Sequence, residues 1–239
     1  MVLILYGSLN TAYGTEAEMK LTIFAATGGI GRQLLEQAVD AGHDVTAAVR
    51  NPQNLTRDVR AISVDLASAD PAPVELAVKG ADAVLSGLGA RTKADAGITS
   101  RGTGAIVAAM AGTDIRRIVV VSAAPMGTVP SPARPQPPKH DPGDGFLMRH
   151  LFAHIAKAAF RANYVDLAVM EDLLRGSDLE WTIARPPKLT DKALTGTYRT
   201  ALGRNVRGGF SISRADVAHS MLRALTQPET IRQTIGEAN

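Results

Sequence analysis

The sequence predicts an α/β protein in which helices cover both faces of one doubly wound parallel sheet. Short, almost continuously apolar runs alternate along the chain with longer runs whose apolar residues recur at helical spacing. Strands of that kind are typical of parallel sheets that are buried on both faces. A glycine-rich turn at residues 28–31 joins the first apolar run to the first helical one, which is typical of a Rossmann-type fold.

The first half of the chain alternates regularly between the two kinds of run. In the first helical run, Ile30, Leu34, Leu35 and Ala38 recur at helical spacing, and Gly42 follows them, as glycine commonly does at a helix end. We expect, in order, strand Leu21–Ala25, helix Ile30–Ala41, strand Asp44–Val49, strand Arg60–Val64, helix Pro71–Val78 and strand Ala83–Ser86.

The second half is less regular because a proline-rich segment interrupts it. Residues 125–145 hold seven prolines and follow Ile118–Ser122, which is the most strand-like run in the chain. A long loop at the carboxyl end of a central strand is expected to contact substrate. Its Met126 would form an apolar wall for a planar ring or part of a solvated cover. We expect, in order, helix Ile98–Ala111, strand Ile118–Ser122, helix Phe146–Arg175, strand Leu179–Arg185 and helix Ser213–Leu225.

Length and composition restrict the class of protein. The 239 residues suffice for one domain, which we expect to span residues 19–239, with residues 1–18 as an N-terminal extension outside the fold. No apolar run approaches the roughly 20 residues of a membrane helix. The chain has no cysteine, which excludes disulfides and thiolate chemistry, and its net charge of +3 is spread without a basic block. We therefore expect a cytoplasmic monomer or homodimer that binds a small phosphate-bearing molecule, and neither nucleic acid nor a membrane.

The glycine turn predicts a dinucleotide site. Ala26, Thr27, Gly28, Gly29, Ile30 and Gly31 would surround the phosphates. Gly28 would let the backbone approach the pyrophosphate, and Gly31 would let helix and strand pack closely. The exposed amides at the helix start would face the phosphates. A tight turn between strand and helix that binds no ligand is the alternative.

An arginine at the end of the second strand predicts NADP(H) rather than NAD(H). Arg50 lies 19 residues after Gly31, where NAD-preferring proteins often place an acidic residue. A guanidinium can form charge-assisted bonds with a 2′-phosphate, whereas a carboxylate would repel it. The alternative is a solvated surface arginine.

Further candidates follow the other strands. Asp65 and Leu66 would flank the adenine, Gly87, Leu88 and Gly89 would permit close passage of the cofactor, and Ser122 would orient the nicotinamide or the acceptor. Ordinary turn chemistry, or a hydroxyl that satisfies backbone groups, would explain the same residues.

In this order, the segments resemble the atypical short-chain dehydrogenase/reductase group. Within it the chain is similar to the NADPH-dependent flavin reductase / biliverdin-IXβ reductase family, from residue 19 to about 226. The residues that carry the likeness include Thr22–Gly28, Gln37–Gly42, Val45–Arg50, Gly80–Val84, Ile106–Met110, Val119–Ala123, Pro186-Pro187, Leu194–Tyr198, Ile212-Ser213 and Met221–Arg223. The resemblance implies that Pro186 and Pro187 lie near the nicotinamide carboxamide and that Ser122 lies beside the nicotinamide and substrate.

The chain departs from this family at two positions. The family's phosphate turn usually begins with Gly, where this chain has Ala25, which is tolerable if the backbone angle φ is negative. The family has a His after its paired prolines, where this chain has Lys188. Lys188 is therefore a candidate catalytic residue beside Ser122, with a solvated loop lysine as the alternative.

The available side chains restrict the chemistry. Ordinary short-chain dehydrogenases use a Tyr and a Lys four residues later, and none of the four tyrosines in this chain has that partner. Four residues after Tyr164, for example, stands Ala168. His150 and His154 have helical spacing but lack the Glu of an HExxH pattern, so we expect no metal site. Glu171 is expected to make a helix or sheet-end contact rather than act as a general acid. Arg214 and Asp216 are explained by an ion pair and by charge at a helix start.

Two functions from different classes fit these residues. The first is an NADPH-dependent oxidoreductase that transfers hydride to a flavin-like or other planar conjugated acceptor, with positioning supplied by the protein. The second is a non-catalytic NADP(H)-sensing regulator of the NmrA type. The missing Tyr/Lys pair is compatible with both, and the likeness through Leu194–Tyr198 favours the reductase.

Overall fold

A computed structural model describes residues 17–68, 70–90, 95, 97–144 and 161–239. Eight strands form one sheet in the order β3-β2-β1-β4-β5-β6-β10-β8, and β7 pairs with β9 in a second, two-stranded sheet. The large sheet is parallel apart from β8, which runs antiparallel to β10 at one edge. The predicted doubly wound α/β fold is confirmed. The strands are β1 (Lys20–Phe24), β2 (Asp44–Val49), β3 (Arg60–Ser63), β4 (Ala83–Ser86), β5 (Arg117–Val121), β6 (Glu180–Arg185), β7 (Lys188–Thr190), β8 (Arg199–Leu202), β9 (Ser211–Ser213) and β10 (Gln233–Ala238).

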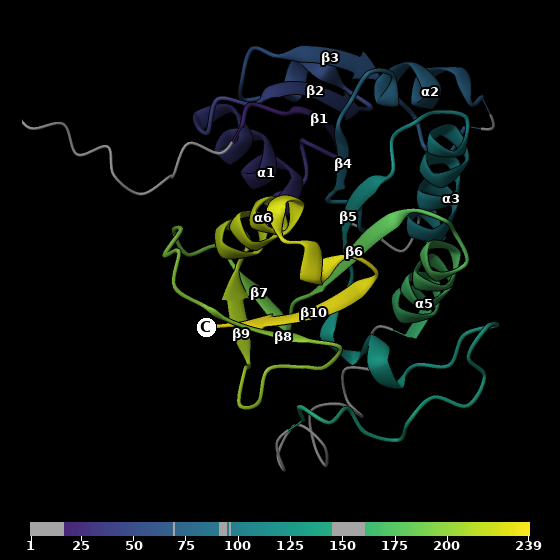
Figure 1. The fold of residues 1–239 in the computed structure, drawn as a ribbon, viewed down its shortest axis with the longest axis vertical. Helices are drawn as coiled ribbons and strands as arrows, with labels where there is room; N and C mark the ends of the chain where they lie inside the picture. The colour runs from purple at the N-terminus through teal and green to yellow at the C-terminus, as the bar shows by residue number, and fades with distance from the viewer. Residues whose placement is uncertain (1–16, 69, 91–94, 96, 145–160) are drawn as a thin grey trace, which may run out of the picture.

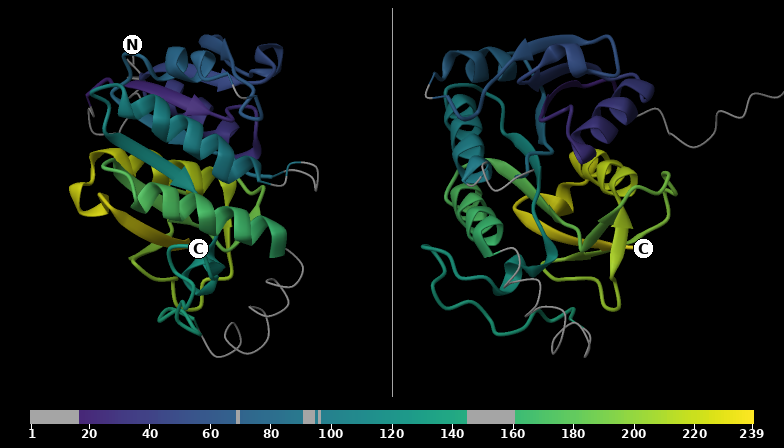
Figure 2. Two further views of the ribbon diagram at one scale, coloured as in Figure 1. Left: turned by 90° about the vertical axis from the view of Figure 1, so that its right-hand side faces the viewer. Right: turned by 180° about the vertical axis from the view of Figure 1, so that it is seen from behind.

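Helices cover both faces of the sheet. Helices α1 and α6 pack together on one face, while α3 packs between α2 and α5 on the other (Figures 1 and 2). Neighbouring residues of β1 point to opposite faces, so Ile23 joins the core under α1 and α6 and Phe24 joins the core under the other three helices. The helices are α1 (Gly29–Asp40), α2 (Ala72–Val78), α3 (Ile98–Ala111), α5 (Arg161–Arg175) and α6 (Arg214–Arg223). Short 3₁₀ turns span Pro52–Asn54, Ala124–Thr128, Ala224–Thr226 and Pro228–Thr230.

The expected elements of the first half match the structure within one residue at each end. Gly42 has a φ of +84° just after α1, which is the left-handed conformation expected of a glycine at a helix end. In the second half the sequence analysis did not identify β7 to β10. These strands are short or polar, as in Gln233–Ala238, and lack the apolar run that marks β5. Of the long helix expected from Phe146, residues 161–175 form α5, and the remainder lies outside the described residues.

The described part of the proline-rich segment is anchored to the rest of the molecule. The Ser131 hydroxyl and the Ala133 amide both donate to the Asp172 carboxylate on α5, each at 2.9 Å. Near its other end, buried Asp141 accepts a 2.8 Å bond from the Asn205 amide. Met126 is fully buried and packs with Val129 and Ala168. It is therefore neither the wall of a ligand pocket nor a solvated cover, and both interpretations of Met126 were wrong.

Candidate functional site

A cavity of about 440 Å³ opens at the carboxyl ends of β1, β2, β4 and β5. The strand order changes direction between β1 and β4, and ligands of open α/β sheets bind at such a switch point. Most of the predicted cofactor residues line this cavity: Thr27, Gly28, Gly29, Ile30, Arg50, Asp65, Leu66, Gly87, Leu88, Gly89 and Ser122. Ala26, Gly31, Pro186, Pro187 and Lys188 are not among the described lining residues.

The part of the cavity beside the start of α1, where the sequence predicted the phosphates, is shaped by glycines. A Cβ atom on Gly31 would lie 2.0 Å from the carbonyl oxygen of Ala25, and one on Gly87 would lie 2.8 Å from the Gly31 nitrogen. Gly31 therefore acts from behind the cavity by letting the turn fold against α1. Gly28 caps α1 without a side-chain hydrogen bond, so the first amides of the helix remain available to an anion.

The residue that begins the turn adopts a conformation that the sequence analysis did not expect. Ala25 has a φ of +58°, whereas tolerance of alanine there was expected to depend on a negative φ. The left-handed region brings a Cβ close to the following carbonyl oxygen, at a cost of about 1–2 kcal/mol for a non-glycine residue. The Ala25 carbonyl nevertheless accepts the Gly28 amide at 2.8 Å, so the turn closes with a strained alanine in place of glycine.

One end of the cavity, where the sequence predicted the adenine, lies at the carboxyl ends of β2 and β3. Arg50 is exposed there and lines the cavity, as do Asp65 and Leu66. The Asp65 carboxylate accepts the Ala67 amide at 3.0 Å, which stabilises its own turn. Arg50 is thus positioned on the rim of the cavity.

The opposite end of the cavity contains Ser122 and Tyr164. Ser122 follows β5 and is 8% exposed, and its amide donates to the Ala184 carbonyl at 2.7 Å. Tyr164 comes from α5, and burial raises the pKa of its phenol. A phenol with a raised pKa is a weak general base at neutral pH, and Ala168 stands where a Lys would lower that pKa.

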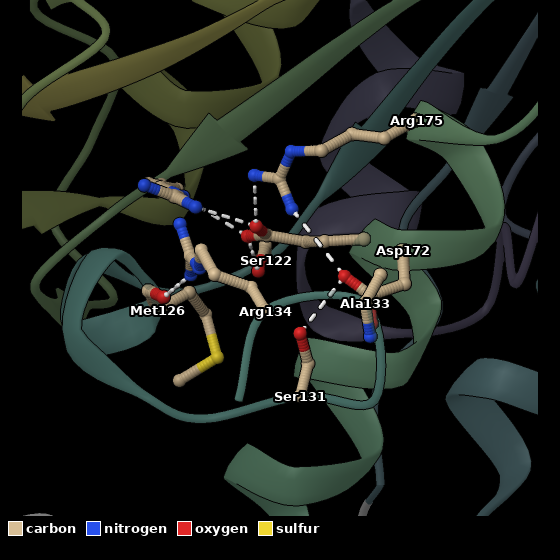
Figure 3. A network of polar contacts seen from close by, with 9 residues as sticks. Ser122, Met126, Ser131, Ala133, Arg134, Asp172 and Arg175 are labelled. Carbon is tan, nitrogen blue, oxygen red and sulfur yellow. Dashed lines mark hydrogen bonds and ion pairs between the residues drawn. The ribbon is translucent and has the colours of Figure 1, made fainter. Parts of the chain in front are cut away.

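Behind Ser122 lies a buried cluster of charged side chains (Figure 3). Ser122 Oγ donates to Glu171 Oε1 at 2.7 Å, and the same oxygen accepts Arg185 Nε at 2.9 Å. Glu171 Oε2 accepts the Nη2 atoms of Arg185 and, at 2.7 Å, of Arg175. Burial alone would raise the pKa of Glu171, but the hydrogen bond and charge of Arg185, with Arg175 and Ser122, lower it. Glu171 is therefore ionised at neutral pH and is not a general acid, as expected from the sequence.

Lys188 lies apart from this cluster. It begins β7, its side chain is exposed, and its amide donates to the Phe210 carbonyl at 3.3 Å. Its neighbour Leu189 lines the cavity, but the alternation of a strand points Lys188 to the other side. The other candidates His150 and His154 lie outside the described residues. The described part of the chain has no cluster of three or more metal-ligating side chains and no helix long and apolar enough to cross a membrane.

The sequence over residues 25–228 matches a family described as NAD(P)H-binding. The chain belongs to this NAD(P)H-binding family. A Schizosaccharomyces pombe protein named UPF0659 is 29% identical over 84% of this chain and 83% of its own. An uncharacterized sugar epimerase of Bacillus subtilis is 28% identical over 89% of this chain and 90% of its own.

Solved structures share the fold. A Streptococcus pneumoniae protein described as an NADH-flavin reductase is 27% identical, with a TM-score of 0.71 over 92% of this chain and 99% of its own. The anaerobilin reductase of Escherichia coli O157:H7 is 23% identical, with a TM-score of 0.71 over 92% of this chain and 96% of its own. The chain therefore has the fold of NAD(P)H-binding oxidoreductases.

The described residues fit the nicotinamide cofactor that this family binds. Only glycine fits at positions 31 and 87, and the uncapped start of α1 faces the cavity. One cation at this point, Arg214, was expected only to form an ion pair at the start of a helix. Its Nε would lie 2.7 Å from a Cβ on Gly29, and it lines the cavity while its Nη1 pairs with Asp191 at 2.6 Å.

Arg214 and Asp216 have separate partners, although both open α6. Asp216 accepts the amides of Thr195 and Gly196 at 2.9 and 3.0 Å, which fixes the loop before β8. Spacing along the chain cannot show that Arg214 meets Gly29, because 185 residues separate them. Tyr164 carries no signal in the sequence, because Ala168 stands four residues after it where a lysine would mark a catalytic pair.

Proposed function

We propose that this chain is an NADPH-dependent reductase of flavin-like or other planar conjugated acceptors. The observation that supports this most is the composition of one continuous cavity. Its phosphate end is made of glycines and free helix amides, and its other end offers Ser122 and Tyr164 without the lysine of an alcohol dehydrogenase. The described solved relatives named as a flavin reductase and an anaerobilin reductase favour the same class of acceptor.

The choice of NADPH over NADH rests on Arg50. Its exposed guanidinium lines the cavity at the end of β2, where it can form a charge-assisted fork with a 2′-phosphate. The matching carboxylate of an NAD-preferring site is not present at this position in the chain.

The protein would act by positioning the cofactor and the acceptor against each other. Bound NADPH supplies a hydride, which carries two electrons, and a proton from solvent completes reduction of the acceptor. The chain's own residues would hold the dinucleotide along the turn, bring the acceptor against it and exclude water. Tyr164, with a pKa raised by burial, would contribute a hydrogen bond and an aromatic surface rather than a base.

Turnover measurements test the proposal. Purified protein is mixed with NADPH and, separately, with FMN, riboflavin, dichlorophenolindophenol or a small quinone, and the loss of NADPH absorbance is followed. Arg50→Ala should weaken NADPH binding by about tenfold or more and leave NADH binding unchanged, because a charged hydrogen bond contributes about 1.5–3 kcal/mol. An unchanged ratio of the two affinities would contradict the NADPH preference.

The regulator of the NmrA type is distinguished by the same assay. Tight NADPH binding without turnover of any acceptor would favour the sensor and contradict the reductase.

A further inference from the structure

Ser122 is the point at which the buried charge cluster meets the cavity. Ser122 lines the cavity, and its hydroxyl lies 2.7 Å from Glu171 Oε1. A hydroxyl group has one proton and two lone pairs. Once a partner accepts the proton, the oxygen can only accept hydrogen bonds from other groups.

Glu171 can only accept. Its side chain is 1% exposed and its two oxygens receive three bonds from Arg185 and Arg175. Arg134 adds a further positive charge nearby, and the other carboxylate of the region, Asp172, is occupied by Ser131 and Ala133. With so many donors around it the carboxylate holds no proton that it could give to Ser122.

We propose that Glu171 is a positioning residue that fixes the direction of the Ser122 hydroxyl. The Ser122 proton points to Glu171, and the oxygen presents a lone pair to the cavity. Ser122 therefore binds an N–H group of the ligand and does not donate to a carbonyl oxygen. This assignment rests on the proposed function, because it requires that the cavity hold a nicotinamide cofactor and a planar acceptor.

The N–H group has two sources, which are the carboxamide of the cofactor and a ring N–H of the acceptor. The first arm of the test measures calorimetric binding of NADP⁺ and of its 3-acetylpyridine analogue, in which a methyl group replaces the carboxamide NH₂. If the cofactor is the source, the wild type should bind the analogue about threefold to tenfold more weakly, as for one neutral hydrogen bond, and Ser122→Ala should remove that difference.

The second arm uses the acceptor. Riboflavin and 3-methylriboflavin differ in one N–H group, and a small quinone has none. If the acceptor is the source, Ser122→Ala should lower affinity for riboflavin by about threefold to tenfold and leave 3-methylriboflavin and the quinone unchanged.

Ser131→Ala is the matched control. Ser131 also donates to a carboxylate of α5, Asp172 Oδ1 at 2.9 Å, but it does not line the cavity. It should therefore change stability without changing any of these ligand preferences. A structural role for Ser122 would make the two variants behave alike.

If the protein folds, Glu171→Gln should turn the Ser122 O–H bond away from residue 171 and toward the cavity. The amide oxygen would stay opposite the two arginine donors on the Oε2 side, and the amide nitrogen would donate to Ser122 while Arg185 Nε loses its acceptor. The freed Ser122 proton should then favour the quinone over riboflavin. If Glu171→Gln does not fold, the two Ser122→Ala arms decide the matter.

The outcomes separate this assignment from the proposed function. Wild-type protein that binds no nicotinamide cofactor would overturn both. Normal cofactor binding, together with a Ser122→Ala variant that loses quinone affinity most or shifts every ligand equally, would overturn the role of Glu171 alone.

Discussion

The two halves of the molecule are stabilised in different ways. In the described residues from 17 to 116 no charged side chain is buried, and the polar groups in the interior are Thr22, Ser86, Thr99 and Thr103. Among the described residues from 117 onwards, seven charged side chains are buried: Arg117, Asp141, Asp166, Glu171, Arg185, Asp216 and Glu237. The first half therefore depends on backbone geometry and apolar packing, whereas the second half adds to its apolar packing several buried charges, most of which are paired or hydrogen-bonded.

The buried charges mostly join segments that are distant in sequence. Asp166 on α5 accepts the Thr99 and Ser100 amides at 2.9 and 3.0 Å and so caps α3, which lacks a side-chain cap of its own. Arg117 donates to the carbonyl oxygens of Glu180 and Ala224 and thereby fastens β5 to the end of α6. A single substitution in the first half should therefore disturb the structure near its own position, whereas one in the second half should disturb several segments at once.

The largest effect is expected from the glycine turn. Gly31→Ala places a Cβ 2.0 Å from the Ala25 oxygen, so the backbone must move, at a cost of more than about 3 kcal/mol, and NADPH binding should be lost. Urea unfolding and calorimetric NADPH binding measure the two effects.

Gly89→Ala is the control for Gly31→Ala. Gly89 lines the cavity, which Gly31 does not, and a Cβ on Gly89 would meet nothing within 4 Å. It should unfold like the wild type. Equal stability of the two variants would contradict the claim that close backbone packing at Gly31 determines the stability of the first half.

The second prediction concerns the buried charge that lacks a partner. Glu237 on β10 is 1% exposed, and neither carboxyl oxygen has a hydrogen bond of normal geometry among the described residues. Burial raises the pKa of Glu237 to about 8, and the Ser220 hydroxyl offsets only part of the rise. The folded state thus holds a proton that the unfolded chain releases near pH 4.5, so stability should fall as pH rises from about 5 to 8, by on the order of 3–4 kcal/mol.

Glu237→Gln should remove most of that decline. The free energy of unfolding is measured from pH 5 to pH 8 for both proteins. Glu171 and Asp216, whose pKa values are lowered, contribute in the opposite sense, since their stabilisation is lost only below about pH 4. A variant whose stability declines as steeply as that of the wild type would show that Glu237 is not the source.

The difference between local features in the first half and long-range contacts in the second explains which parts of the structure the sequence could predict. The glycine turn, Arg50 and strands β1 to β5 follow from local spacing, because each depends on residues close in sequence. Glu171 meets Ser122 across 49 residues, so only the three-dimensional structure brings them together. Strands β7 to β10 escaped prediction for a different reason: they are short or, as in β10, hold polar groups such as Thr234 and Glu237 at interior positions.

The third prediction concerns the contact between the two halves. Arg214 from α6 lies against Gly29 of the turn, where it can bind the cofactor pyrophosphate. Arg214→Ala should weaken NADPH binding by about threefold to tenfold with little change in stability, because the side chain is 31% exposed. Asp191→Asn removes the same ion pair but frees the guanidinium, so it should preserve or strengthen binding. If both variants weaken binding alike, the ion pair and not the phosphate contact matters.

The smallest effect is expected at Ala25, a residue of the turn that has a left-handed backbone conformation without being glycine. Its φ of +58° disfavours alanine, so Ala25→Gly should relieve about 1–2 kcal/mol of strain. Glycine also increases the entropy of the unfolded chain, which offsets about 0.4–1 kcal/mol, and the net gain should be about 0.5–1 kcal/mol. The neighbouring Ala26 is 1% exposed and has no positive φ, so Ala26→Gly should instead destabilise the protein. Thermal unfolding of the two variants should therefore shift in opposite directions, and a shift of both in the same direction would mean that the backbone angle at Ala25 stores no strain.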